Sequence, residues 1–153
     1  MKVSEVMTAP PVCVAPDVSL VGTTRRMAEY AVGSVLVVED GGALRGIVTD
    51  RDLAVRGMGG GLDAEARVDA VMSPQVVTVE AGDELQVAYQ TFRRTGVRRL
   101  PVLDAGRVVG MLTIDDLFLD VFRKLADLLG PVAWSVLQEP PGPTSQAWAP
   151  HAS

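Results

Sequence analysis

An internal repeat is the feature that most constrains how this chain can fold. Val6-Met7-Thr8 recurs as Val71-Met72-Ser73, 65 positions later, and Gly46–Leu53 recurs as Gly110–Leu117, 64 positions later. We place the loss of one residue near Ala31, at a predicted helix-to-strand turn, because loops absorb length changes that helices and strands do not. The 153-residue chain is therefore expected to form two small, similar units within one compact module.

Both copies begin with the same predicted strands and turns. Short β-branched runs, bounded by Pro, Ala and Gly, open the copies at 12–14 and 76–79 and predict strands. Two pairs of apolar runs, 35–38 with 44–48 and 100–103 with 108–112, flank turns that contain Gly. This pattern is typical of β-hairpins, so each copy is expected to hold three strands.

Two helices complete each copy. In the second copy Leu85, Ala88 and Phe92 recur at helical spacing and form an apolar stripe, and in the first copy Asp17 is the predicted N-cap. A last helix begins at Asp50 in one copy and at Ile114 in the other. The predicted fold class is therefore α/β, with two tandem β-α-β-β-α repeats.

The predicted boundaries are 1–58 for the first repeat, 59–70 for a Gly-rich linker and lead-in, 71–130 for the second repeat and 131–153 for a C-terminal segment. Gly130-Pro131 is expected to end the last helix, because proline disrupts a helix interior. The Leu and Phe residues of this extended helix cover more than one narrow stripe, which indicates a partner surface. The C-terminal segment is rich in Pro and poor in apolar residues, so we expect it to be mostly a disordered tail.

Composition and charge exclude several kinds of function. A net charge of −5 and a pI near 4.8 argue against broad electrostatic capture of nucleic acid. One cysteine, Cys13, excludes an internal disulfide, and with one histidine, His151, there is no cluster of soft metal ligands. No apolar run approaches the roughly 20 residues of a membrane span, and Glu5 interrupts any secretory signal. We expect a soluble, cytoplasmic protein with no metal site and no membrane contact.

The most specific motif occurs once in each copy. It consists of Gly, two apolar residues, Thr, two variable residues and Asp, and it stands at Gly46–Asp52 and at Gly110–Asp116. Leu100–Asp104 precedes the second motif and reads as an apolar residue, Pro, Val, a variable residue and Asp. With these motifs, residues 3–124 resemble a stand-alone pair of CBS domains. The resemblance implies pseudo-two-fold symmetry and a cleft that binds an adenosine-type nucleotide, of the AMP, ADP, ATP, S-adenosylmethionine or NAD class.

The Thr and Asp residues of the motif have two compatible interpretations. Thr49 with Asp52, and Thr113 with Asp116, have the spacing of a helix capping box. A strand that leads into a helix N-terminus also presents free N–H groups to a phosphate. The resemblance implies that the two Asp residues accept hydrogen bonds from ribose hydroxyls and that the two Thr residues contact the ribose-phosphate end.

Arg98-Arg99 are the best candidates for binding phosphate, because guanidinium groups form paired, charge-assisted hydrogen bonds with it. The alternative is a solvated turn. Aligned with a separation of 64, the first copy has Ser34-Val35 at these positions and Val37 in place of Pro101. This asymmetry favours one occupied site, to which the second copy contributes the basic residues.

The resemblance also implies which residues hold the base. They are Val12, Cys13, Val14, Val77, Thr78 and Pro101. Core packing is the alternative for each valine, and Cys13 is expected to be a small buried residue rather than a redox centre. No covalent cofactor is expected, Mg²⁺ would enter only with a nucleotide phosphate, and no catalytic set is found, so we expect no enzyme activity.

Three functions stay open at this point. The first is a regulatory sensor, in which the nucleotide biases one state of a homodimer that acts on an unidentified protein in trans. The resemblance implies that two such pairs dock through their helices into a disc-shaped homodimer. The second is a structural dimerisation module with empty clefts, which the departures at Ser34-Val35 and Val37 favour. The third is nucleic-acid binding through arginines at 51, 56, 93, 94, 98, 99 and 107, and the acidic net charge makes it the weakest.

Overall fold

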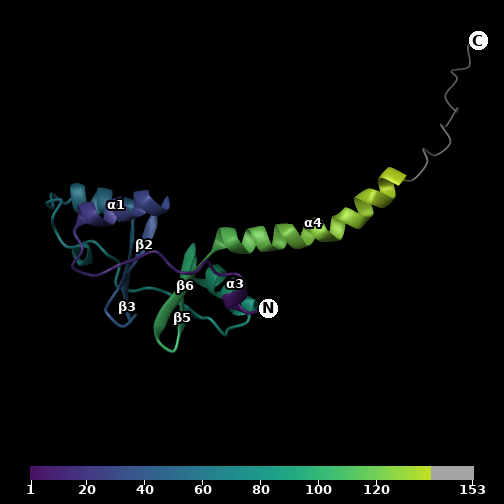
Figure 1. Ribbon diagram of the computed structural model, residues 1–153, viewed down its shortest axis with the longest axis horizontal. Coiled ribbons are helices and arrows are strands. Elements are labelled where there is room, and N and C mark those ends of the chain that lie inside the picture. The colour runs from purple at the N-terminus through teal and green to yellow at the C-terminus, as the bar shows by residue number, and fades with distance from the viewer. Residues whose placement is uncertain (139–153) are drawn as a thin grey trace, which may run out of the picture. The chain divides into compact units, whose positions relative to one another are not determined.

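The structure is a computed structural model that describes residues 1–138, with side chains as far as residue 131. The chain divides into two units, of which the first is Met1–Leu117 and the second begins at Phe118. The first unit contains the two repeats, and the described part of the second unit continues the last helix (Figure 1). No helix in the described part of the chain combines the length and the apolar character that crossing a bilayer requires.

Each repeat contains a three-stranded mixed sheet with one long helix beside it (Figure 1). The first repeat comprises β1 (Cys13–Val14), α1 (Leu20–Tyr30), β2 (Ser34–Val38), β3 (Leu44–Thr49), α2 (Asp50–Asp52) and a π-helix (Leu53–Met58). The second comprises β4 (Val79–Glu80), α3 (Leu85–Thr95), β5 (Arg99–Asp104), β6 (Arg107–Thr113) and α4 (Ile114–Gln138). In both sheets the first strand is parallel to the second, and the second and third form an antiparallel hairpin. The predicted β-α-β-β-α order is confirmed in both copies.

Short helical segments lead into each repeat, and these segments are exchanged between the repeats. Val3, in the 3₁₀ helix Val3–Glu5, lies in the core of the second repeat, and its N–H donates to Asp83 O at 2.9 Å. Val68, in the 3₁₀ helix Val68–Ala70, lies in the core of the first repeat, and its N–H donates to Val18 O at 2.7 Å. Each repeat therefore completes its core with residues that precede the other repeat in the sequence.

Three predicted boundaries were wrong. Ser19, not Asp17, caps α1, because the Ser19 hydroxyl accepts a hydrogen bond from Gly22 N at 3.1 Å. The strand predicted at 76–79 is only Val79–Glu80, since the residues before it form no ladder.

The third wrong boundary is the end of the last helix. Helix α4 continues through Gly130 and Pro131 to Gln138. A proline inside a helix removes one hydrogen bond and bends the axis without necessarily ending the helix, and α4 changes direction in its last turns (Figure 1). Of the predicted tail, residues 139–153 lie outside the described residues.

The residue lost between the copies lies in the hairpin loop and not near Ala31. Val14 pairs with Val37, and Val79 pairs with Val102, so the separation is still 65 in β2 and β5. It becomes 64 after the hairpins, whose loops are 40–42 in the first repeat and 105–106 in the second. The shorter loop is possible because Ala105 and Gly106 both adopt positive φ, as a two-residue hairpin turn requires.

This register changes which residues of β2 and β5 correspond to each other. Arg99 pairs with Thr113 as Ser34 pairs with Thr49, so Arg99 corresponds to Ser34 and Arg98 to Gly33. Pro101 consequently corresponds to Leu36 rather than to Val37.

Candidate functional site

A cavity of about 230 Å³ lies between the two repeats. Its first-repeat lining is Thr8, Pro10, Pro11, Val12, Val32, Gly33 and Ser34, and its second-repeat lining is Arg99, Met111, Thr113 and Asp116. The lining combines apolar surface from Val12, Val32 and Met111 with hydroxyl, carboxylate and guanidinium groups. Such a combination is typical of a pocket that holds a ligand with an apolar ring and a polar end.

A pair of backbone hydrogen bonds joins the two sides of this cavity. Thr8 N donates to Met111 O at 2.8 Å, and Met111 N donates to Thr8 O at 3.0 Å. The approach requires the motif glycine, Gly110, because a Cβ there would lie 3.0 Å from Thr8 O and 2.4 Å from Met7 Sδ. The glycine of the repeated motif therefore allows the lead-in of the first repeat to form one wall of the site.

Thr113 and Asp116 form the start of α4 at the polar end of the cavity. Thr113 N donates to Asp116 Oδ2 at 2.8 Å, and Asp116 N donates to Thr113 Oγ1 at 3.1 Å, so the predicted capping box is confirmed. Within residues 1–131, Asp116 Oδ1 accepts no hydrogen bond and pairs with no cation. One carboxylate oxygen at the cavity is thus engaged in capping, and the other is open to a ligand hydroxyl.

Thr49 and Asp52 form the same capping box in the first repeat, but they do not line this cavity. Thr49 N donates to Asp52 Oδ2 at 2.9 Å, and Asp52 N donates to Thr49 Oγ1 at 3.2 Å. The other oxygen, Asp52 Oδ1, lies 3.7 Å from Arg56 Nε. The two motif aspartates are therefore equivalent in the fold and different in their surroundings.

The two adjacent arginines occupy different places. Arg99 is exposed and lines the cavity together with Thr113 and Asp116. Arg98 does not line it, and its carbonyl accepts a hydrogen bond from Ile114 N at 3.1 Å. Of the predicted phosphate-binding pair, the structure brings Arg99 to the cavity.

The residues predicted to hold the base are also divided. Val12 lines the cavity, whereas Val14 and Pro101 are buried in the fold, and Val77 and Thr78 lie outside the cavity. The prediction missed seven lining residues: Thr8, Pro10, Pro11, Val32, Gly33, Ser34 and Met111. Thr8 and Met111 lie in the repeated motifs, which is a signal in the sequence. Their proximity depends on the exchange of the lead-in segments, which no local pattern reveals.

Cys13 is half-buried beside the cavity and does not line it. Its Sγ donates to Pro11 O at 3.6 Å. Burial raises the pKa of the Cys13 thiol, and the charge of Arg26 opposes this shift to a smaller extent. A raised pKa reduces the thiolate fraction, so the environment matches a structural cysteine rather than a reactive one.

Comparisons with known proteins agree with the repeat. The CBS domain family model matches residues 3–58 and 68–122. The CBS domain-containing protein YhcV of Bacillus subtilis is 34% identical over 115 residues, which are 75% of this chain and 81% of that protein. The CBS domain protein PAE2072 of Pyrobaculum aerophilum, solved in complex with AMP, superposes with a TM-score of 0.68 at 25% identity and covers 76% of this chain and 90% of its own.

A third relative is an enzyme, but the similarity covers only a small part of it. Inosine-5'-monophosphate dehydrogenase of Mycobacterium bovis is 32% identical over 112 residues, which are 72% of this chain and 20% of the enzyme. The other four-fifths of that enzyme lie outside the matched region. With the family model covering both repeats, the chain belongs to the CBS-domain family, as a tandem pair of CBS domains.

Proposed function

We propose that this chain is a regulatory module that binds an adenosine-type nucleotide in the cavity between its repeats. The observation that carries this proposal is the meeting of Arg99, Thr113 and Asp116 at one cavity with an apolar wall. AMP in the related PAE2072 complex supports this ligand class. The ligand would bind non-covalently, and its effect would pass to a protein partner in trans.

Each part of the ligand matches a different part of the lining. The base would lie against Val12, Val32 and Met111, which supply apolar surface. Asp116 Oδ1 would accept hydrogen bonds from the ribose hydroxyls, because a carboxylate can serve two adjacent donors. The phosphate would lie at the mouth, where the exposed Arg99 can pair with it.

The cavity volume indicates how the ligand would be divided between interior and mouth. About 230 Å³ is less than the roughly 300 Å³ at which ligand pockets usually begin. It therefore suits a nucleoside better than a whole nucleotide. We propose that the adenosine part enters the cavity and that the phosphate stays near solvent, where Mg²⁺ could accompany it.

A ligand screen tests the proposal directly. We expect AMP, ADP, ATP, S-adenosylmethionine or NADH to raise the melting temperature of the purified chain. A ligand at about 100 times its Kd stabilises the folded state by about 2.7 kcal/mol. If none of them shifts the melting temperature or gives a calorimetric signal at millimolar concentration, the chain is a structural module with empty clefts instead.

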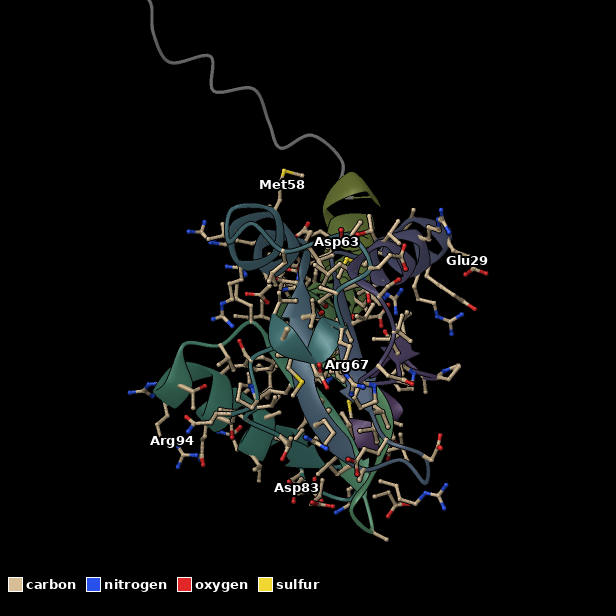
Figure 2. All side chains as sticks on the ribbon, turned by 90° about the vertical axis from the view of Figure 1, so that its left-hand side faces the viewer. Glu29, Met58, Asp63, Arg67, Asp83 and Arg94 are labelled. Carbon is tan, nitrogen blue, oxygen red and sulfur yellow. The ribbon has the colours of Figure 1, made fainter. Side chains whose placement is uncertain are left out.

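We also propose that a second copy of the chain is its first partner, docked on an apolar groove of the first repeat. The groove has a volume of about 890 Å³ and lies between α1 and the segment that follows α2. Its apolar lining includes Leu20, Val21, Met27, Leu53, Met58 and Leu62. Met58 is 81% exposed and projects from the surface (Figure 2). A two-fold axis would let identical grooves cover each other, which is how most homodimers are built.

We expect the chain to be dimeric at micromolar concentration and Met58→Asp to weaken the dimer at least about tenfold. A carboxylate that loses water without a partner is strongly unfavourable in an apolar interface. Equilibrium sedimentation measures the change, and Ala43→Asp, on the exposed hairpin, is the matched control for added charge. A wild-type chain that sediments only as a monomer contradicts this part of the proposal.

A further inference from the structure

The pseudo-symmetry defines a position in the fold that is equivalent to the cavity. Thr8, Met111, Thr113 and Asp116 of the cavity correspond to Ser73, Ile47, Thr49 and Asp52. The correspondence extends to the backbone, because Ile47 N donates to Ser73 O at 3.1 Å and Ser73 N donates to Ile47 O at 2.9 Å. We call this place, defined by these four residues, the Asp52 position. It has the same backbone pairing and the same Thr and Asp residues as the cavity at Asp116.

Arg56 occupies the Asp52 position. Its Nε lies 3.7 Å from Asp52 Oδ1. Its Nη1 lies 3.3 Å from Val71 O, 3.4 Å from Met72 O and 3.5 Å from Ser73 Oγ. The guanidinium thus spans from the motif aspartate to the lead-in of the other repeat, between the equivalents of Asp116 and Thr8.

Among the side chains of residues 1–131, no cation takes the corresponding place in the second repeat. Asp120 is the equivalent of Arg56, and its carboxylate accepts from Lys124 Nζ at 2.7 Å. The backbone also differs, because Leu53–Met58 is a π-helix whereas the equivalent residues 117–122 are α-helical. π-Helical turns are rare and are frequently found at functional sites. Sequence and backbone therefore both distinguish the two positions.

From these contacts we infer that Arg56 is a built-in occupant of the Asp52 position and limits the chain to one nucleotide. This inference rests on the proposed nucleotide binding at Asp116. The Arg56 charge pairs with the Asp52 oxygen that ribose hydroxyls would contact at Asp116, and its Nη1 donates to Val71 O and Met72 O. A ligand at Asp52 therefore has to displace a charged group that is already held from both sides. The aspartate is largely enclosed, at 16% exposure, whereas the Arg56 side chain is 52% exposed and can be removed without opening the core.

Removing Arg56 is therefore expected to create a second site for the same ligand class. At the Asp52 position the carboxylate would then be open to ribose hydroxyls, as it is at Asp116. Arg98 and Arg99 would lie near this second site, because they are the equivalents of Gly33 and Ser34, which line the cavity. Arg98, which does not line the cavity at Asp116, would then be the phosphate partner of the new site, with Arg99 between the two sites.

Calorimetric titration with AMP tests the inference. We expect one AMP per wild-type chain and two per Arg56→Ala chain, with the Kd of the second site within about tenfold of the first. Arg51→Ala, which removes a neighbouring exposed arginine, should keep one site. Arg56→Lys should also keep one, because its ammonium still pairs with Asp52. The double variant Arg56→Ala with Asp116→Asn should keep the new site and bind AMP about 10- to 100-fold more weakly at the original cavity.

The outcomes separate this inference from the proposed function. An Arg56→Ala chain that gains no site, while its circular dichroism and melting curve show a folded protein, overturns the inference. Two sites in the wild type and one in Arg56→Ala also overturn it, because Arg56 would then be a ligand-binding residue. A wild type that binds no AMP overturns the proposal for Asp116, and a single site in Arg56→Ala would then still support the role of Arg56.

Discussion

Replacing Asp116 with Asn is expected to weaken AMP binding by about 10- to 100-fold. The carboxylate would accept two ribose hydroxyls, and hydrogen bonds to a charged group contribute about 1.5–3 kcal/mol, where each 1.4 kcal/mol is a factor of ten. Asparagine retains an oxygen that can accept from Thr113 N, so the start of α4 should persist. Calorimetry measures the affinity, and thermal unfolding without ligand checks that the fold is kept.

Asp52→Asn is the matched control for this variant. Asp52 has the same capping role as Asp116, but its second oxygen already lies near Arg56. We expect the affinity for AMP to change less than about threefold, which is far below the effect expected for a hydrogen bond to a charged group. Equal affinities of the wild type and both variants would remove Asp116 from the site, and a larger loss in Asp52→Asn would place the ligand at the other repeat.

Gly46→Ala is expected to destabilise the folded chain by about 1–3 kcal/mol, the usual cost of forcing extra volume into a close contact. A Cβ at Gly46 would lie 2.7 Å from Ser73 O and 2.7 Å from Met72 Sδ. The methionine can move, but the carbonyl belongs to the backbone that pairs with Ile47. Thermal unfolding would report a melting temperature lower by roughly 2–4 °C per kcal/mol for a chain of this size.

Gly82→Ala is the control for this effect. A Cβ there meets no atom within 4 Å, and the residue is exposed. Its replacement is expected to be neutral or slightly stabilising, because alanine reduces the freedom of the unfolded chain. If both variants melt at the temperature of the wild type, the contact between Gly46 and Ser73 is not tight in solution.

The sequence predicted those parts of the fold that depend on local pattern. The hairpins, the stripe on α3 and the capping boxes at Thr49 and Thr113 each have a signal within a few residues, and the structure confirms them. The end of α4 was not predictable in this way, because the cost of a proline in a helix competes with the tendency of its apolar neighbours to remain helical. The position of the lost residue was also misplaced, since strand register is set by pairing with distant residues.

Only those site residues that have a local signal in the sequence could be predicted. Arg99, Thr113 and Asp116 lie on or beside the repeated motif, and the repeat identifies them. Pro10, Pro11 and Val32 reach the cavity only because the strands and lead-ins of one repeat pack against the other. Asp52 differs from Asp116 in its surroundings because Arg56 lies beside it. The sequence alone does not distinguish Arg56 from any other arginine.

The exchange of the lead-in segments has a consequence for how the chain can be divided. Neither repeat has a complete core within its own stretch of sequence, because Val3 belongs to one core and Val68 to the other. We therefore expect a single unfolding transition that involves both repeats. A fragment that begins after Val71 would be missing the residue that closes its interior, and adding a peptide of residues 1–8 should restore its structure. A cut between the copies therefore separates each repeat from part of its own core, and the two are expected to function only as a pair.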